Sequence, residues 1–333
     1  MGERLKVLLV GCGYIAQAEH IPNWLQSPHG RLVGVVDSRE GLARETGERL
    51  GLPWFTEVER ALAACDSDAL HICTPPASHA DLVRLAAKTG RHVLVEKPLA
   101  PAAAAAADVA RTASEAGIRC MVGYHKFFDT DLTELARRLR AGDLGRPLGI
   151  QSVWKLSLPP VWPGRGVWPR TTVPSADLPG AELLRYLLLD QSIHHFSLFR
   201  RWVGEALRVE AVQWSGSLWH VTLTFTGEVP VWHTNAGPVA HGDEIRVYGE
   251  EGIYDVSPWS PHFPWSFAAS RFARKSGEVT IPALARVNPY AAQIAEFVAS
   301  VREGRPPVAD AAESVGDIRL VERIVEAFAA QSG

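Results

Sequence analysis

The sequence predicts an α/β protein of two domains, in which a parallel sheet is followed by an α+β domain with a large, mostly antiparallel open sheet. The chain has 333 residues, about twice the length of a common single domain. Up to Tyr124, short apolar runs alternate with helical segments, a pattern typical of βαβ units. After Tyr124, the strands are longer and alternate between apolar and polar residues, which indicates a sheet with one solvated face.

The first half is expected to form the parallel sheet, because strands buried on both faces read as near-continuous apolar runs. The predicted strands cover residues 5–10, 31–37, 68–76, 91–98 and 118–124. Helices are predicted between them over residues 14–26, 58–64, 78–90 and 101–117. The first domain is therefore expected to span residues 1–123.

The second domain is expected to span residues 124–333, with the alternative that its C-terminal helices pack back on the first domain. A helix is predicted over 129–142, and a last one from Asn288 and Pro289 to Gly304. Strands are predicted over 205–214, 218–227, 229–237 and 243–256. In the second of these strands, one face is wholly apolar and consists of Trp219, Val221, Leu223 and Phe225.

Two segments, 153–174 and 257–289, are predicted to be loops rich in Trp and Pro. Nine of the eleven tryptophans lie after residue 150, so aromatic side chains are concentrated in the second domain. We expect these aromatics to pack at a subunit interface or within the loops. The alternative is that some of them line a substrate pocket.

Composition and charge exclude several classes of protein. The net charge of −3 gives no basic field for nucleic acid or a membrane surface, and no apolar run is long enough to span a bilayer. The four cysteines form no CxxC pair, so we expect reduced, partly buried thiols in a cytoplasmic protein. No metal is expected, because the histidines are scattered and the adjacent His194 and His195 would point about 100° apart on a helix.

The strand at 5–10 leads directly into a glycine-rich turn that opens a helix. Gly11, Gly13 and Ala16 match G-x-G-x-x-G/A, in which small residues permit a tight turn, close approach of a pyrophosphate and helix–strand packing. Asp37 ends the second strand, where a carboxylate would bind a ribose 2′-hydroxyl. The pattern predicts a Rossmann-type dinucleotide site that favours NAD. NADP stays an alternative, since Arg39 next to Ser38 could receive a 2′-phosphate.

A lysine follows the strand at 91–98 within the sequence "VEKP". The carboxyl edge of a parallel sheet is where ligands bind in open α/β folds. Lys97 could there donate to a substrate oxygen and stabilise its alkoxide-like state. Because the chain has only six lysines, this position is less easily explained as a chance surface residue.

Several segments in this order resemble the glucose-fructose oxidoreductase/inositol dehydrogenase family: "GCGYIA", "VVDSR", "CTPPASH", "EKP" and "LLLDQSIHHFSLFRRWVG". The resemblance extends to "AGDLGRPLG" and "FVASVREGRPP" and covers nearly the whole chain. It implies that Lys97, Asp190 and His194 are catalytic, with Asp190 and His194 sharing one helix face at i and i+4. The coenzyme contacts expected are Gly11, Gly13, Tyr14, Ile15, Ala16, Asp37, Ser38, Arg39, Thr74, Pro75, His79, Glu96 and Lys97.

The reaction that the resemblance implies is hydride transfer between a nicotinamide and a secondary alcohol of a sugar, polyol or nucleotide sugar. His194 would act as the general base, because an unperturbed imidazole titrates near neutral pH. The alternatives are a coenzyme-binding regulator without turnover and a glycosidase that uses bound NAD for transient oxidation. The resemblance also implies a homodimer or homotetramer built on the open sheet.

The chain departs from the pattern of that family around the expected substrate. Ser192 and Ser197 stand where the family often has Gly and Asp, and His125 and Lys126 occupy an Asn-x-Arg-Phe-like segment. The substrate contacts expected are therefore Lys97, His125, Lys126, Asp190 and His194. Basic residues near these positions would suit a phosphate or carboxylate, although solvated loop charges are the simpler interpretation; they are Lys126, Lys155, Arg165, Arg170 and Arg185.

Overall fold

The structure is a computed structural model, and it describes residues 3–155, 178, 180–215, 218–236, 242–258 and 268–331. These residues divide into two compact units. The first comprises residues 3–125 and 290–318, and the second comprises the others. The predicted domain boundary between residues 123 and 124 stays a prediction. None of the described helices is long and apolar enough to cross a membrane.

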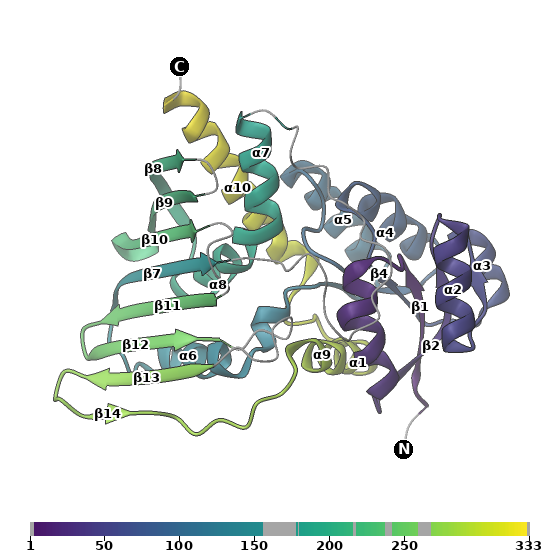
Figure 1. Cartoon of the computed structure of the whole chain (residues 1–333), viewed down its shortest axis with the longest axis horizontal. Coiled ribbons are helices and arrows are strands. Elements are labelled where there is room, and N and C mark those ends of the chain that lie inside the picture. Colours follow the sequence, from purple (N-terminus) through teal and green to yellow (C-terminus); the bar gives the residue numbers. More distant parts are fainter. Residues whose placement is uncertain are drawn as a thin grey trace. The chain divides into compact units, whose positions relative to one another are not determined.

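The first unit contains a six-stranded parallel sheet in the order β3-β2-β1-β4-β5-β6 (Figure 1). Its strands are β1 (Leu5–Val10), β2 (Gly30–Val36), β3 (Trp54–Phe55), β4 (Ala69–Ile72), β5 (His92–Val95) and β6 (Cys120–Val122). The central strands are buried on both faces, as their continuous apolar runs predict; Val7, Leu8 and Leu9 have no exposed surface. The predicted Rossmann-type sheet is confirmed, and β3 is a sixth strand that the sequence analysis missed.

Helices connect the parallel strands. They are α1 (Ile21–Gln26), α2 (Glu40–Leu50), α3 (Val58–Ala64), α4 (His79–Lys88) and α5 (Ala103–Glu115), and α9 (Pro289–Glu303) belongs to the same unit. Helix α9 begins at Pro289 and ends at Gly304 (φ +66°), as predicted. A last helix, α10 (Ala311–Gln331), begins in this unit and ends in the other.

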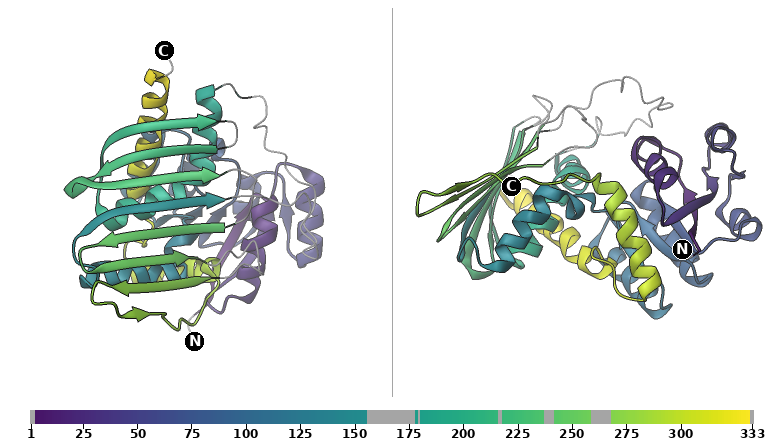
Figure 2. Two further views of the ribbon diagram at one scale, coloured as in Figure 1. Left: turned by 60° about the vertical axis from the view of Figure 1, so that its left-hand side comes forward. Right: turned by 90° about the horizontal axis from the view of Figure 1, so that it is seen from below.

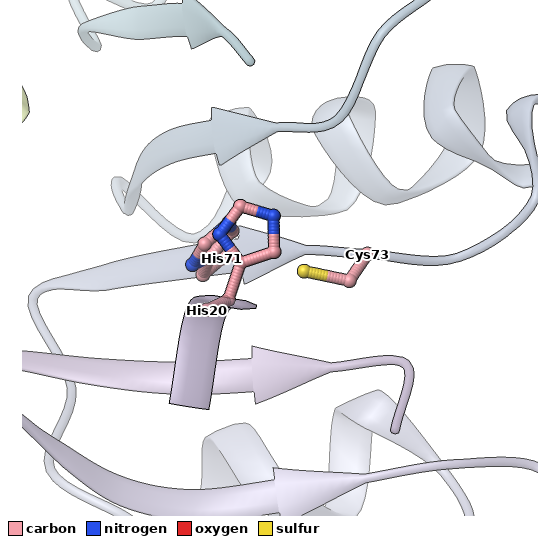
Figure 3. Close-up of side chains that lie close together, drawn as sticks. All are labelled: His20, His71 and Cys73. Carbon is pink, nitrogen blue, oxygen red and sulfur yellow. The ribbon is translucent and has the colours of Figure 1, made fainter. Parts of the chain in front are cut away.

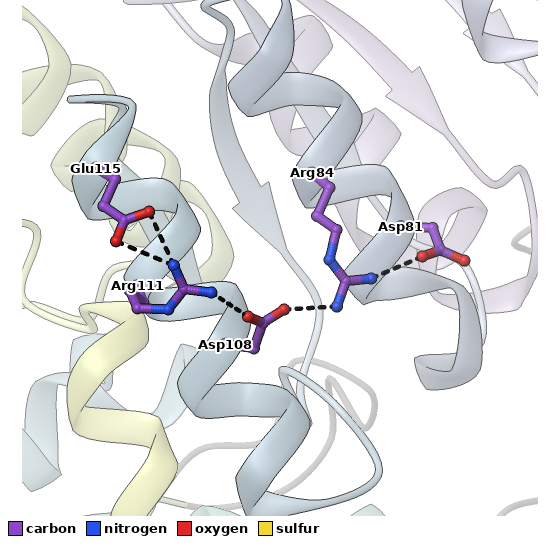
Figure 4. A network of polar contacts seen from close by, with 5 residues as sticks. All are labelled: Asp81, Arg84, Asp108, Arg111 and Glu115. Carbon is purple, nitrogen blue, oxygen red and sulfur yellow. Dashed lines mark hydrogen bonds and ion pairs between the residues drawn. The ribbon is translucent and has the colours of Figure 1, made fainter.

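The exposed sides of α4 and α5 are linked by charges of alternating sign (Figure 4). Arg84 binds Asp81 on its own helix and Asp108 on α5, and Arg111 binds both Asp108 and Glu115. Pairs at this exposure each contribute about 0–1 kcal/mol, so the network adds little to the stability of the fold.

The helical segment predicted over residues 14–26, with an interruption at Pro22, is present, but it is not regular α-helix throughout. A π-helical turn, η1 (Ala16–His20), precedes α1, in which Pro22 occupies the first turn. A π-turn inserts one residue relative to an α-helix and is common near functional sites. Here it carries His20 into the core, where the side chain has no exposed surface.

The second unit contains an eight-stranded sheet in the order β14-β13-β12-β11-β7-β10-β9-β8, in which only the β7–β10 pair is parallel among the described strands. The strands are β7 (Pro147–Lys155), β8 (Ala206–Ser215), β9 (Leu218–Phe225), β10 (Val229–Ala236), β11 (Gly242–Gly249), β12 (Gly252–Ser257), β13 (Ala269–Arg274) and β14 (Val279–Thr280). The predicted, mostly antiparallel open sheet is thus confirmed.

Two loop predictions are wrong in part. Residues 153–155 belong to β7, and β13 and β14 lie within the segment 257–289. Strand β14 has only two residues, which are too few to show alternation. The remainder of the first loop, from residue 156 on, and residues 259–267 lie outside the described residues.

Helices α6 (Thr130–Ala141), α7 (Gly180–Leu187) and α8 (Ile193–Val203) lie against one face of this sheet (Figure 2). No described helix of the unit covers the other face. On the covered face, β9 contributes apolar side chains, as expected: Trp219, Val221, Leu223 and Phe225 are all buried. Asp129 caps α6 by accepting hydrogen bonds from the backbone N–H groups of Asp131 and Leu132, both at 3.0 Å.

Candidate functional site

The glycine-rich turn after β1 has the backbone that a pyrophosphate site requires. Gly11 has φ +94°, and a Cβ there would lie 2.7 Å from the carbonyl carbon of Cys73, so only glycine fits. A Cβ on Gly13 would meet no described atom within 4 Å, so this side of the turn is open to an incoming group. Ala16 is fully buried, which brings the following helical turn close to the sheet. These features fit a dinucleotide held at the start of a helix.

Asp37 follows β2, and its side chain contacts the glycine-rich turn after β1. Its Oδ2 accepts a hydrogen bond of 2.9 Å from the backbone N–H of Cys12, and Arg39 binds both carboxylate oxygens through Nε (2.9 Å) and a terminal nitrogen (3.0 Å). Burial opposes ionisation of Asp37, but the hydrogen bonds from Arg39 and Cys12 hold its pKa below the ordinary value. The residue is therefore a buried carboxylate with a half-exposed guanidinium beside it, and its contact with a ribose hydroxyl stays a prediction.

Two further expected coenzyme contacts lie in the turn after β4. Ser78 donates to the hydroxyl of Thr74, and His79 has its two ring nitrogens 2.8 Å and 2.9 Å from the carbonyl oxygens of Thr74 and Pro98. His79 itself is fully buried, and burial lowers its pKa. It lies between the loops after β4 and β5, and its own contact with a coenzyme stays a prediction.

Glu96 and Lys97 follow β5 at the same carboxyl edge as the glycine turn and Asp37. Oε1 of Glu96 is 2.8 Å from Nε2 of His20, and Oε2 accepts from the backbone N–H of Lys97 at 3.1 Å. Burial opposes ionisation of Glu96, but His20 lowers the pKa of this carboxyl below its ordinary value. Glu96 is thus a buried carboxylate that fixes the backbone at half-buried Lys97.

His20, His71 and Cys73 form a buried cluster behind this edge (Figure 3). One ligand-type atom of each lies within 4.8 Å of the others, a spacing that raises the question of a metal ion. The indole N–H of Trp24 donates to Nδ1 of His71 at 2.7 Å, so the single proton of neutral His71 is on Nε2. A nitrogen that carries a proton cannot ligate a metal, and the cluster therefore does not suit one.

His20 completes this arrangement. Its Nε2 faces the Glu96 carboxylate and must carry the proton, which leaves Nδ1 as an acceptor. The rings of His20 and His71 meet edge to face with centroids 4.2 Å apart, and Tyr290 of α9 meets His20 at 5.1 Å. Tyr290 also stacks on His125, with centroids 4.6 Å apart. His125, an expected substrate contact, is therefore part of the buried aromatic packing of the first unit.

Asp190 and His194 do not lie on one regular α-helix. A π-helical turn, η4 (Leu188–Ser192), separates α7 from α8, so Asp190 lies in the π-turn and His194 in the first turn of α8. That the two side chains share one face stays a prediction. Asp190 is half-buried, and His194 is buried at 4% exposure.

The surroundings of His194 include residues that sequence reasoning missed. The ring of Trp154 on β7 is parallel to that of His194, at 3° with centroids 5.9 Å apart, and Nζ of Lys126 lies 4.6 Å from the centroid of Trp154. Lys126 is not an unpaired cation, because it forms a short ion pair with Asp243. Nε2 of His195 lies 2.7 Å from the other oxygen of Asp243.

Asp243 is the charged centre of this group. Burial opposes its ionisation, but His195 and Lys126 hold its pKa well below the ordinary value. The other described basic candidates also face acids: Lys155 is 2.5 Å from Glu244, and Arg185 is 3.7 Å from Glu322. Arg165 and Arg170 lie outside the described residues.

Lys97 belongs to the first unit, and Asp190 and His194 belong to the second. The convergence of these three side chains on one substrate therefore stays a prediction, as do the individual coenzyme and substrate contacts. The four cysteines are free and buried.

Comparison with known proteins agrees with the fold and the glycine turn. Residues 5–124 match a family model described as an oxidoreductase family with an NAD-binding Rossmann fold. Scyllo-inositol 2-dehydrogenase (NAD(+)) of Bacillus subtilis is 26% identical over 61% of this chain and 55% of its own length. D-xylose 1-dehydrogenase (NADP(+)) 2 of Haloferax volcanii is 27% identical over 96% of this chain and 95% of its own length. The solved structure of aldose-aldose oxidoreductase from Caulobacter crescentus superposes with a TM-score of 0.82 at 22% identity, covering 99% and 98% of the two chains.

The fold and the coenzyme loop, with these matches, define the chain as an NAD(P)-dependent oxidoreductase. Within that class, the matches support the predicted membership of the glucose-fructose oxidoreductase/inositol dehydrogenase family.

Proposed function

We propose that the protein transfers a hydride between a nicotinamide coenzyme and a secondary alcohol carbon of a sugar, polyol or nucleotide sugar. One observation carries the proposal: the glycine turn, Asp37 and Lys97 follow the carboxyl ends of three strands in one parallel sheet. In such a sheet these ends meet at one edge, where ligands bind. The relative that matches over 96% of the chain is named as a dehydrogenase of a sugar, and the one that matches over 61% as a dehydrogenase of an inositol. These names support this substrate class.

Each proposed residue has a separate task. Asp37 would accept from the adenosine ribose and favour NAD, while Arg39 offers an alternative contact for the 2′-phosphate of NADP. Lys97 would donate a hydrogen bond to the reacting oxygen and stabilise its developing negative charge. His194 would take the hydroxyl proton, and Asp190 would bind a neighbouring hydroxyl or orient the pair. The coenzyme, when bound, accepts or supplies the hydride.

The substrate side is proposed to recognise uncharged hydroxyl groups more than anions. Lys126, which could have bound a phosphate or carboxylate, is already neutralised by Asp243. A buried ammonium that has its own carboxylate offers little net attraction to a second anion. His125 and Lys126 are therefore proposed to shape the substrate region rather than to supply a free charge.

We also propose a homodimer or homotetramer formed through the uncovered face of the large sheet. Trp232 on β10 lies on that face and is 37% exposed, so its indole offers apolar surface to a second copy. Light scattering coupled to gel filtration measures the mass directly. A monomer at micromolar concentration would remove this part of the proposal.

The decisive experiment is a panel of polyols, sugars and nucleotide sugars, each with NAD or NADP, followed through the absorbance of the reduced nicotinamide. Turnover of at least one neutral polyhydroxy compound is the expected result. Coenzyme binding without turnover on the whole panel would favour a regulator. Cleavage of an aryl glycoside without net absorbance change would favour an NAD-assisted glycosidase.

A further inference from the structure

A buried chain of polar side chains runs across the helix-covered face of the large sheet from Trp219 to Asp243 and passes through Ser192 of η4. Ser192 of η4 accepts from the indole N–H of Trp219 at 3.3 Å and contacts Nε2 of His233 at 2.8 Å. Nδ1 of His233 is 2.7 Å from the hydroxyl of Ser152, which is 3.3 Å from Nδ1 of His195. His195 then meets Asp243. The residues between Trp219 and Asp243 are Ser192, His233, Ser152 and His195, and each is at most 1% exposed.

The two ends of this chain determine the direction of every hydrogen bond. An indole N–H only donates and a carboxylate only accepts. Because Ser192 accepts from Trp219, its own O–H is available for Nε2 of His233. Neutral His233 then carries its proton on Nδ1 and donates to Ser152, which in turn donates to His195. Burial lowers the pKa of His233 well below its ordinary value, which agrees with a neutral ring that accepts at Nε2.

The spacing of Ser152, His195 and Asp243 is similar to a Ser-His-Asp hydrolytic site, but it does not fit that chemistry. Ser152 has no exposed surface, and its oxygen is already shared between two imidazoles. A nucleophile must reach its substrate, so this group is structural in character. These polar side chains do, however, contact the π-turn, through Ser192.

A second contact ties the same turn to the same strand. Nδ2 of Asn235 donates to Oε1 of Gln191 at 2.7 Å. His233 and Asn235 are two residues apart on β10, so both side chains point to the helix-covered face, and both are fully buried. Gln191 and Ser192 directly follow Asp190 within η4. His233 and Asn235, which are neighbours on one face of β10, thus hold two consecutive residues of the turn.

We propose that His233 is a positioning residue for the reaction: through Ser192 it holds the π-turn in the register that orients Asp190, and Asn235 supports it through Gln191. The inference rests on the proposed function for its consequence in turnover. Its structural part concerns η4 alone. A lone π-turn is a less favourable arrangement than continuous α-helix, so a side-chain contact from the sheet is needed to fix it.

Two substitutions of His233 separate its two contacts. Gln places an amide oxygen where Nε2 lies and keeps an acceptor for Ser192, whereas Asn places an amide nitrogen where Nδ1 lies and keeps the donor to Ser152. Thr234→Val is the matched control, because it removes a hydrogen bond to His220 on the opposite face of the same strand. For all three variants we would measure hydrogen–deuterium exchange over residues 186–196, and then kcat and KM with the best substrate of the panel.

We expect His233→Asn to raise exchange in η4 by roughly fivefold to tenfold, the effect of one lost hydrogen bond. Its kcat should fall by roughly tenfold or more, with the KM for the coenzyme unchanged. His233→Gln and Thr234→Val should stay within about twofold of the wild-type protein in both measurements. Equal effects of the Asn and Gln variants on exchange and kcat would overturn the proposal, because loss of a merely structural histidine would affect both variants equally.

The experiment also distinguishes failure of this inference from failure of the proposed function. If no substrate is turned over but exchange in η4 separates the Asn from the Gln variant, the positioning contact holds and the proposed function fails. Should His233→Asn not fold, Ser192→Ala removes the same contact, and we expect the same rise in exchange. Unchanged exchange in Ser192→Ala would overturn the proposal.

Discussion

Replacing Asp37 by alanine should change which coenzyme the protein prefers. In the structure the carboxylate is shared between the backbone N–H of Cys12 and the guanidinium of Arg39. When NAD binds, the ribose hydroxyls compete with Arg39 for the same two oxygens. Removing the carboxylate deprives NAD of these acceptors and at the same time releases Arg39 for the 2′-phosphate of NADP.

The size of the effect follows from these contacts. Hydrogen bonds to a charged group contribute about 1.5–3 kcal/mol, so NAD should bind about 10- to 150-fold more weakly to Asp37→Ala. Arg39 is 47% exposed, and its contact with a phosphate is therefore screened to about 1 kcal/mol, or roughly a fivefold gain for NADP. The ratio of the two dissociation constants should shift toward NADP by roughly two orders of magnitude. The variant also leaves the buried N–H of Cys12 without this acceptor, which costs about 1–3 kcal/mol of stability.

Fluorescence titration of NADH and NADPH measures both constants without a substrate. Asp68→Ala is the matched control, because Asp68 also accepts from a backbone N–H, that of Lys6, but lies before β4 at the opposite edge of the sheet. Arg39→Ala should act in the opposite sense and weaken NADPH alone. An unchanged NADH to NADPH ratio in Asp37→Ala would refute the assignment of Asp37 as the ribose contact.

Three further predictions concern turnover, pH and stability. Lys97→Met should lower kcat by about 10²–10³ through loss of a donor to the reacting oxygen, with coenzyme affinity within about twofold of wild type; wild-type turnover would contradict this role. Burial raises the pKa of Asp129 from its ordinary 3.8 to about 6, so the folded chain binds more protons than the unfolded chain between these values and this group's contribution to stability is lost as pH rises through 6. The free energy of unfolding of Asp129→Asn minus that of the wild type should therefore increase between pH 4 and pH 7, by at most about 3 kcal/mol. Denaturant unfolding at both pH values measures this difference, and a constant difference would contradict the raised pKa. Asp243→Asn leaves the buried ammonium of Lys126 without its carboxylate and should cost about 3–5 kcal/mol in denaturant unfolding, whereas a loss below about 1 kcal/mol would show that the pair is dispensable.

The elements that the sequence predicted correctly are those whose signal is local. The parallel strands are continuous runs of aliphatic residues, and β9 shows strict alternation, so each could be recognised within its own segment. Helix α2 was missed because Gly41 and Gly47 interrupt it and Leu42 is its only buried large aliphatic residue. The glycine turn and Asp37 were readable for the same reason, since a single βαβ unit sets their separation.

The contacts that build the second half of the site are not local. Lys126 and Asp243 are 117 residues apart, and Ser152 and His233 are 81 residues apart. Ser152 and His233 meet because β7 pairs with β10, and no pattern within one strand encodes that order. A partial signal was present in β10, whose inward positions change from Val229 and Val231 to His233 and Asn235. Polar side chains at core-facing positions must find partners, and that change could have indicated a buried network.

The two buried clusters also bear on which histidine can act as a base. Each has an indole N–H at one end, from Trp24 or Trp219, and a carboxylate at the other, from Glu96 or Asp243. His71 and His233 are each held in one tautomer by their hydrogen bonds. To take up a second proton, either ring would have to break one of these hydrogen bonds, and burial already lowers the pKa of both well below the ordinary value. Neither cluster includes His194, and a base must change its protonation in every catalytic cycle. The arrangement therefore favours His194 over His71 and His233 for that task.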